Sequence, residues 1–306
     1  MVRFCLLMLV AAGVHAADSG VDIDTAASLY QAAQVRPQVQ ASLGAMPAHV
    51  RQLFAADGAS KLSDQQLAAV TAAAQRGFRI DVFEPPALSA LAANLDPASV
   101  KKSLAFLESD LGRRMVAADV AAAQLDEATI DKVMTGALVA ASTPERDALM
   151  NKLERASQYT ESTVQIFLTM GQAVATGTAT GSGMDAIAVT DRARKSGEAS
   201  RAGLQESMRE PLRRYMSYGY RDLSIADLKH LLAFFESPPG KRYTAAFIVA
   251  MSAGFDAMGR HCGEELGESL RELAQAQMPP EGMTPGGSAD APHGEAPGPE
   301  APSHNP

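Results

Sequence analysis

A segment of 24 residues occurs twice in this chain, and no other sequence feature limits the fold so strongly. Residues 95–118 and 223–246 align without a gap and share twelve identities. Each copy contains a nine-residue stretch, FLESDLGRR at 106–114 and FFESPPGKR at 234–242, at a spacing of 128 residues (234 minus 106). Self-similarity at a fixed spacing indicates a duplicated structural unit. We therefore expect two similar units in tandem.

The second copy of this stretch has the features of a joint between two helices. The first helix is expected to end near Ser237, because a residue before proline avoids the helical region. Ser237 is a favoured N-cap residue, and Pro238 suits the first position of a new helix. Gly240 then lies in the first turn, where the missing side chain allows two helices to cross closely.

The first copy keeps this arrangement with different residues. Ser109 takes the capping position, and Asp110 places an acid at the positive end of the next helix. Each copy also has a glutamate before the joint and an arginine after it, and we expect these two to pair across the joint. The residues assigned to this structural motif are Phe106, Glu108, Ser109, Gly112, Arg114, Phe234, Glu236, Ser237, Pro238, Gly240 and Arg242.

A second interpretation makes part of the same stretch a polar binding site. Glu236, Ser237, Lys241 and Arg242 supply the polar groups for it. The structural interpretation is preferred, because the capping, proline and glycine preferences already account for the stretch without a ligand.

The second copy resembles the bacterial domain of unknown function 2059 (DUF2059). The similarity covers about 25 residues in each copy, and the first copy departs from the family pattern at Leu107 and Asp110. Membership implies an all-helical, exported protein of Gram-negative type, and it implies no activity, catalytic residue or cofactor. The residues that carry the resemblance are Leu223, Ser224, Asp227, Leu228, Phe234, Phe235, Ser237, Pro238, Gly240, Lys241 and Arg242.

Composition and periodicity indicate an all-α fold. The chain has no Trp and only 5% aromatic residues, and no segment alternates with period two as a strand would. Helix starts are visible at Ser63, which opens a capping box, and at Thr143, which precedes a proline. We expect two helical units of similar architecture, at 17–142 and 143–277.

The two ends of the chain are expected to lie outside these units. Arg3, a short apolar run and the small residues around Ala16 have the pattern of a cleaved secretory signal at 1–16. No stretch has the length and low charge of a membrane span. Residues 278–306 are rich in Pro, Gly, Ala and Glu, which predicts a disordered tail. The protein is thus expected in the periplasm of a Gram-negative bacterium.

Charge and cysteine content exclude some classes of function. The chain has 27 basic and 35 acidic residues, so an exported protein of this kind is a poor nucleic-acid binder. Cys262 is the one cysteine left after signal removal, which excludes an intramolecular disulfide. Polar neighbours such as His261 and Glu264 favour a partly exposed thiol and a minor disulfide-linked homodimer through Cys262.

Three stretches have the residue types of catalytic or metal sites, and each has a simpler interpretation. The glycine-rich stretch 173–185 lacks the Lys-Ser/Thr pair of a phosphate loop and predicts a flexible loop. Ser252 is rejected as a nucleophile, because it lies within a helical pattern rather than on a strand-to-helix turn. His261 and Glu265 share a helix face but lack a third metal ligand, so no metal or other cofactor is expected.

The function expected from these features is non-catalytic. We interpret the chain as a binding or interaction module of the bacterial envelope, with an envelope protein or an apolar ligand as its partner. An alternative is a carrier that holds a lipid or apolar peptide in an interhelical groove. A further alternative is a hydrolase whose site combines distant residues. The methionines that suit either a groove or a core are Met208, Met216, Met251 and Met258.

Overall fold

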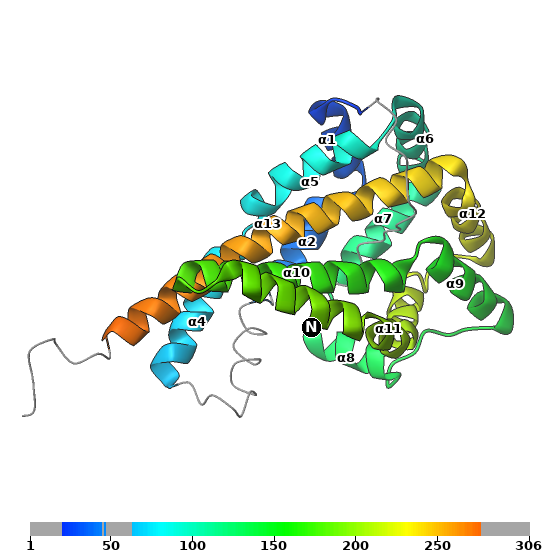
Figure 1. Cartoon of the computed structure of the whole chain (residues 1–306). Helices are drawn as coiled ribbons and strands as arrows, with labels where there is room; N and C mark the ends of the chain where they lie inside the picture. Colours follow the sequence, from blue (N-terminus) through cyan, green and yellow to red (C-terminus); the bar gives the residue numbers. More distant parts are fainter. Residues whose placement is uncertain (1–19, 45, 47–62, 277–306) are drawn as a thin grey trace, which may run out of the picture.

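Twelve helices and no strand form the described part of the chain, residues 20–44, 46 and 63–276 of a computed structural model (Figure 1). The predicted all-α class is confirmed. The predicted signal sequence at 1–16 and the predicted tail at 278–306 lie outside the described residues. The helices of the first half are α1 (Ile23–Ala32), α2 (Val35–Leu43), α4 (Asp64–Gly77), α5 (Ile80–Asn94), α6 (Pro97–Leu107), α7 (Asp110–Ala123) and α8 (Glu127–Thr135). The helices of the second half are α9 (Pro144–Ala156), α10 (Tyr159–Ser182), α11 (Ala186–Gly219), α12 (Ile225–Glu236) and α13 (Pro238–Ala276).

Side-chain caps fix where most of these helices begin. The Ser63 hydroxyl accepts from the Gln66 backbone N–H, and the Gln66 side chain accepts from the Ser63 N–H, which completes the predicted capping box. The Thr143 hydroxyl accepts from the N–H of Arg146, so α9 starts where the sequence predicts. Helix starts are therefore encoded locally.

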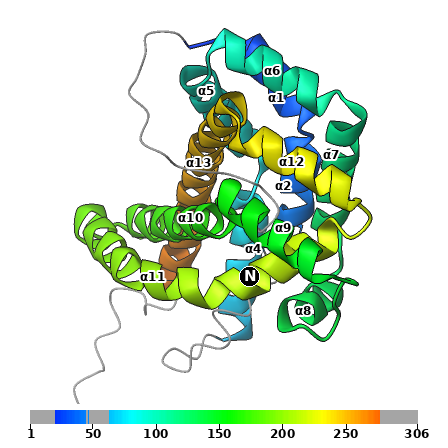
Figure 2. The same ribbon diagram turned by 90° about the vertical axis from the view of Figure 1, so that its right-hand side faces the viewer.

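The longest helix, α13, packs against both halves of the chain. It contacts α4, α5 and α6 from the first half and α10 and α12 from the second. Figure 2 shows α13 among helices of both halves. The buried side chains form one continuous hydrophobic cluster, and Phe83 of α5 meets Phe255 of α13 edge to face at 4.9 Å. The predicted boundary at residue 142 falls between α8 and α9, but the segments on either side share this core.

The glycine-rich stretch 173–185 belongs mainly to α10, so the predicted loop is wrong there. Its glycines face glycines of α13, and the two backbones approach closely. A Cβ added at Gly177 would lie 2.1 Å from the carbonyl oxygen of Arg260, and one at Gly263 would lie 2.2 Å from that of Val174. Helix backbones meet this closely only where small residues line both surfaces. Tertiary packing has thus overridden the low helix propensity of glycine.

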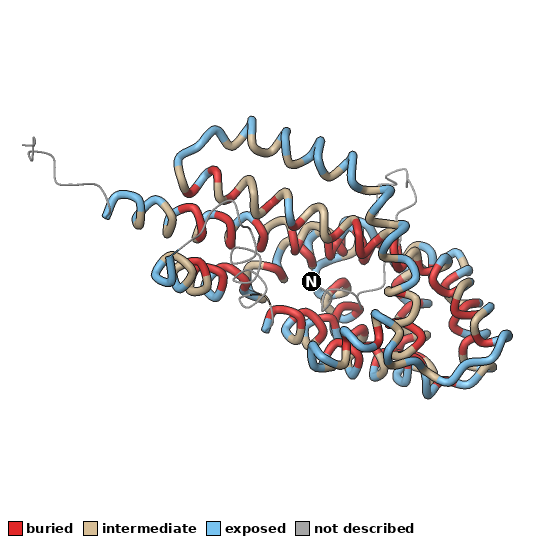
Figure 3. The backbone as a smooth tube through the Cα atoms, turned by 90° about the horizontal axis from the view of Figure 1, so that it is seen from below, coloured by how far each residue is buried: buried red, intermediate tan, exposed pale blue. Residues whose placement is uncertain are grey.

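Along its first part, helix α11 packs against the rest of the molecule on one side only. Its buried positions begin at Leu212, and the preceding turns are exposed or half-buried (Figure 3). Hydrogen bonding between the hydroxyls of Thr176 and Thr190, 2.8 Å apart, ties this part to α10. No helix in the described part of the chain combines the length and apolar character needed to cross a bilayer.

Candidate functional site

Both copies of the repeated stretch form the helix joint that the sequence predicts. The backbone N–H of Gly112 donates to Ser109 Oγ at 3.0 Å, and that of Gly240 donates to Ser237 Oγ at 3.2 Å. Each serine hydroxyl also donates to the carbonyl oxygen three residues earlier, at 2.6 Å in both copies. The two serines therefore end one helix and start the next.

The glycines of the joint allow the two helices of each copy to meet at their backbones. A Cβ added at Gly112 would lie 2.0 Å from the carbonyl oxygen of Phe106, and one at Gly240 would lie 1.9 Å from that of Phe234. Such distances are far shorter than van der Waals contact. Both glycines are thus required for close approach, as predicted.

We expect Gly240→Ala to lower the free energy of unfolding by about 1–3 kcal/mol, since the added methyl group must push the Phe234 carbonyl away. Gly203→Ala is the matched control. No atom lies within 4 Å of a Cβ added at Gly203 in α11, so this change should stabilise by about 0.5–1 kcal/mol through helix propensity. Urea unfolding of both variants measures the difference. Equal stabilisation by the two substitutions would contradict the close approach at the joint.

The arginines of the joints pair between the copies, so the predicted pairing with Glu108 and Glu236 is wrong. Arg114 Nη2 lies 2.6 Å from Asp227 Oδ1 in α12, and Arg242 Nε lies 3.6 Å from Asp96 Oδ2 at the start of α6. Both glutamates are exposed and make no ion pair with another described residue. Asp227 and Asp96 lie at helix starts, where the positive end of the helix dipole favours a negative charge. The paired arginines add to this stabilisation. Each copy's arginine therefore reaches the first helix of the other copy.

An aromatic contact lies between the same two copies. The rings of Phe106 and Phe234 stack with centroids 3.7 Å apart and planes 6° apart. The Arg114 guanidinium beside Asp227 holds the pKa of that carboxyl well below its usual range. Ser237 serves as a cap and Arg242 pairs with Asp96, so these residues hold helices together. Few polar groups of the stretch then remain for the alternative polar binding site.

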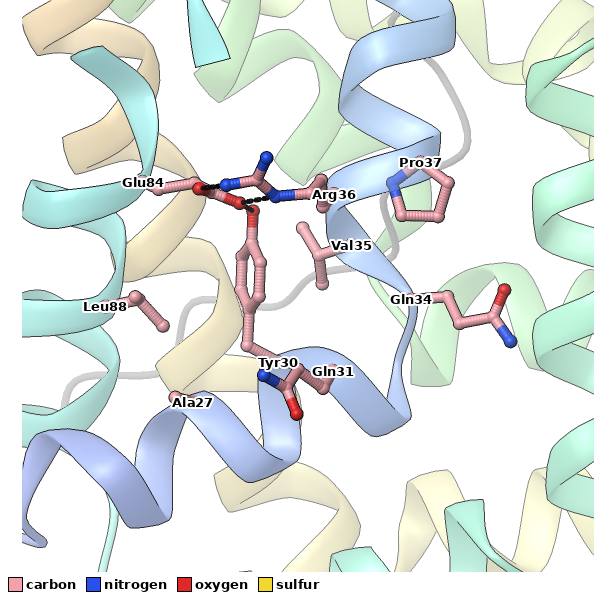
Figure 4. A pocket seen from close by; sticks show the side chains of 9 residues that line it. All are labelled: Ala27, Tyr30, Gln31, Gln34, Val35, Arg36, Pro37, Glu84 and Leu88. Atoms are coloured by element: carbon pink, nitrogen blue, oxygen red, sulfur yellow. Dashed lines mark hydrogen bonds and ion pairs between the residues drawn. The ribbon is translucent and has the colours of Figure 1, made fainter. Parts of the chain in front are cut away.

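A pocket of about 450 Å³ opens elsewhere, between α1, the turn into α2, and α5 (Figure 4). We call it the Tyr30 pocket. Apolar side chains line part of it, and a polar group made by Tyr30, Arg36 and Glu84 lines another part. Its lining residues are Ala27, Tyr30, Gln31, Gln34, Val35, Arg36, Pro37, Glu84 and Leu88.

The turn between α1 and α2 brings the polar group together. Gln34 adopts a left-handed conformation, with φ 48° and ψ 44°, which lets α2 begin immediately after α1. Val35 is buried at the start of α2, and Leu29 is buried near the end of α1. Burial of these two residues fixes the positions of α1 and α2, so that Tyr30 and Arg36 both reach Glu84 of α5.

Glu84 is the shared acceptor of this polar group. Its Oε1 accepts from Arg36 Nε at 2.8 Å and from the Tyr30 hydroxyl at 3.2 Å. Arg36 Nη2 binds Oε2, so the guanidinium and the carboxylate form a two-point ion pair. Burial, together with the negative charge of Glu84, raises the pKa of Tyr30 well above its usual value. Tyr30 is therefore a neutral hydrogen-bond donor at any physiological pH.

No family model, curated protein or solved structure matches the chain. The resemblance to DUF2059 therefore stays a prediction that rests on the quoted residues. The candidate site is therefore inferred from the geometry of this structure alone. Sequence reasoning missed the Tyr30 pocket, because Tyr30 and Glu84 are 54 residues apart and follow no motif spacing.

Cys262 is fully buried, so the predicted partial exposure is wrong. It faces α4 at Gly77, where an added Cβ would lie 2.3 Å from the Cys262 Cα. Burial raises the pKa of the thiol to about 12, with the charge of Glu265 as a smaller cause. Polar neighbours in sequence misled the prediction, because they lie on other faces of α13. A disulfide between two folded copies is not accessible to this thiol.

We expect native Cys262 to react with a thiol reagent such as a maleimide only after the helices separate. A buried, protonated thiol is a poor nucleophile. Intact-mass measurement after timed labelling should show no adduct in buffer and complete labelling in urea. On a non-reducing gel, wild type and Cys262→Ser should migrate identically as monomers. A dimer band present only in the wild type would contradict this burial.

The other candidate residues fall into structural roles. Glu265 pairs with Arg76 of α4 at 2.6 Å, and no cluster of metal-binding side chains occurs among the residues described. Ser252 lies within α13, as the sequence predicts for a residue that is not a nucleophile. Met216, Met251 and Met258 are buried in the core, whereas Met208 is partly buried against it. These methionines therefore fill the core rather than line a groove.

Asp119 of α7 is a buried acid that sequence reasoning also missed. Only 7% of its surface is exposed, and it hydrogen-bonds to Tyr220 at the end of α11. Burial raises the pKa of Asp119 to about 8. The carboxyl group is therefore mostly protonated at neutral pH, and it joins helices from the two halves of the chain. A carboxyl inside the expected apolar face of a helix was the available sequence signal.

Proposed function

We propose that this protein is an exported, non-catalytic binding protein of the bacterial envelope that takes a small ligand in the Tyr30 pocket. The pocket carries the proposal, because it combines an apolar lining with a few polar groups held in fixed positions. Location in a Gram-negative periplasm is supported by the signal-like residues at 1–16 and by the resemblance to DUF2059.

The arrangement of the polar group favours binding over catalysis. Nucleophilic catalysis needs a nucleophile beside a base. The residues that line the pocket include no serine, threonine, cysteine, lysine or histidine, and the Tyr30 phenol keeps its proton. Contacts among Tyr30, Arg36 and Glu84 hold these side chains in place and present a fixed surface to a ligand. Hydrolase chemistry therefore has no support from this pocket.

A carrier of a lipid or apolar peptide is the second candidate. Its predicted groove rested on methionines, three of which are buried in the core. The Tyr30 pocket has an ion pair at its side, and an acyl chain bound there would remove these charges from water without replacing their contacts. We therefore favour a small ligand. An envelope protein as a further partner stays a prediction.

We also propose that the chain arose by duplication of one helical unit. Support comes from the shared joint at Ser109 and Ser237 and from the ion pairs that each copy makes with the other. Left-handed residues between helices add to this, since Gln34 precedes α2 and Gln158 precedes α10 in the same backbone conformation.

Native mass spectrometry of the protein purified from its own envelope tests the binding function. We expect a small retained molecule on the wild type, and none on Ala27→Phe, whose added ring fills the pocket from its lining. Circular dichroism confirms that the variant is folded. Retention of the same molecule by both proteins, or its absence from the wild type, would show that the pocket is not the binding site.

A further inference from the structure

We propose that the Tyr30 pocket takes a compact zwitterion, an α-amino acid with a branched apolar side chain. This inference rests on the proposed binding function and names the class of ligand. Three observations support it: the unused hydrogen-bonding capacity of the ion pair, its paired charges, and the apolar lining beside it.

The ion pair in the pocket leaves donors and an acceptor free. Arg36 uses Nε and Nη2 on Glu84, and its Nη1 donates to no other described residue. Glu84 Oε1 accepts two hydrogen bonds, while Oε2 accepts one and keeps a free lone pair. A ligand in the pocket thus has N–H groups on Arg36 and one acceptor on Glu84 left to bind. Half of the Arg36 side chain is exposed, so these donors are reachable.

The charges of the pair select a ligand that carries both signs. An anion attracted to Arg36 is repelled by Glu84 beside it, and a cation attracted to Glu84 is repelled by Arg36. A zwitterion places its carboxylate on the guanidinium and its ammonium on the carboxylate, so both contacts are attractive. Partial burial of Glu84, whose side chain is 13% exposed, makes the second contact stronger than it would be in bulk water.

The remainder of the pocket fits a small aliphatic side chain. Ala27, Val35 and Leu88 supply apolar surface around the Tyr30 ring, as Figure 4 shows. A volume of about 450 Å³ is large enough for an amino acid of leucine size. Leucine is therefore a suitable probe.

Calorimetric titration with four leucine derivatives tests the charge preference. The series is leucine as the zwitterion, N-acetyl-leucine as the anion, protonated leucinamide as the cation, and N-acetyl-leucinamide as the neutral compound. We expect leucine to bind the wild type at least tenfold more tightly than each of the others. Equal affinity for leucine and any one of the others, or no binding of leucine, would overturn the zwitterion inference.

Two variants should change this preference in opposite directions. Glu84→Gln leaves Arg36 uncompensated, so N-acetyl-leucine should then bind more tightly than leucine. Arg36→Met leaves Glu84 uncompensated, so leucinamide should be preferred. The control is Arg79→Met, which removes the arginine of an exposed ion pair with Asp81 and should leave the order unchanged. An unchanged order in both pocket variants would also overturn the inference.

Failure of this inference can be separated from failure of the proposed function. If leucine does not bind but native mass spectrometry finds another small molecule that Ala27→Phe excludes, the binding function stands and the zwitterion class is wrong. If the wild type retains nothing and binds no leucine derivative, both are wrong. Urea unfolding of each variant confirms that loss of binding does not reflect loss of the fold.

Discussion

Gly263→Ala should lower the free energy of unfolding by about 3 kcal/mol or more, because the added methyl group would meet only backbone atoms of another helix. A Cβ at this position would lie 2.2 Å from the Val174 carbonyl oxygen, 2.7 Å from the Thr178 nitrogen and 2.9 Å from the Gly177 Cα. All three atoms belong to the α10 backbone, which cannot turn away as a side chain can. The two helices must therefore move apart along their whole contact.

Gly171→Ala is the control for this prediction. Gly171 also lies within α10, but nothing is within 4 Å of its added Cβ. It should stabilise the protein by about 0.5–1 kcal/mol, because alanine is the better helix former. Urea denaturation of both variants gives the comparison. Similar free energies of unfolding for the two would mean that α10 and α13 do not pack through their glycines.

Stability should fall as the pH rises from 5 to 8, and Asp119 should account for much of the fall. The pKa of this carboxyl is about 8 in the folded protein, above its ordinary value of 3.8. The folded state therefore holds the proton more tightly than the unfolded state does. Its contribution to stability is complete below pH 3.8 and is lost progressively up to about pH 8. At about 1.4 kcal/mol per pH unit, the loss between pH 5 and 8 is up to about 4 kcal/mol.

Asp119→Asn isolates this effect, since it keeps the size of the side chain and cannot ionise. The difference in unfolding free energy between wild type and variant, measured by urea at several pH values, cancels the other titrating groups. Carboxyls such as Asp227 and Asp96, whose pKa is lowered, lose their contribution only on acidification, below this window. A difference that stays constant from pH 5 to 8 would show that Asp119 is ionised throughout.

Local features of the fold could be predicted from the sequence, whereas long-range ones could not. Caps at Ser63, Ser109 and Ser237 depend on residues three positions away, and the structure has each of them. Partners of Arg114 and Arg242 depend on how the copies pack, so assigning them to neighbours in sequence failed. The helix in stretch 173–185 was also missed, because packing against a segment distant in sequence decides its conformation. Its glycines are explained only by the second helix that they contact.

The candidate site was less predictable than the fold. Tyr30, Arg36 and Glu84 come from three helices, and a tyrosine, an arginine and a glutamate at such spacings match no motif. Burial of Cys262 could not be predicted either, because it packs against Gly77 of α4, which is 185 residues away in the sequence (262 minus 77). A titratable residue within an apolar helix face, as at Asp119, was the one usable signal in the sequence.

The position of α13 has a consequence for the order in which the protein folds. This helix is the last of the described part to be synthesised, yet it covers α4 and α5 from the first half. The ring contact between Phe83 and Phe255, for example, forms only after α13 has been made. Contacts so distant in sequence slow folding and leave apolar surface exposed in the meantime. A nascent chain of this protein therefore stays incompletely folded until α13 has been made, which is compatible with the export proposed above.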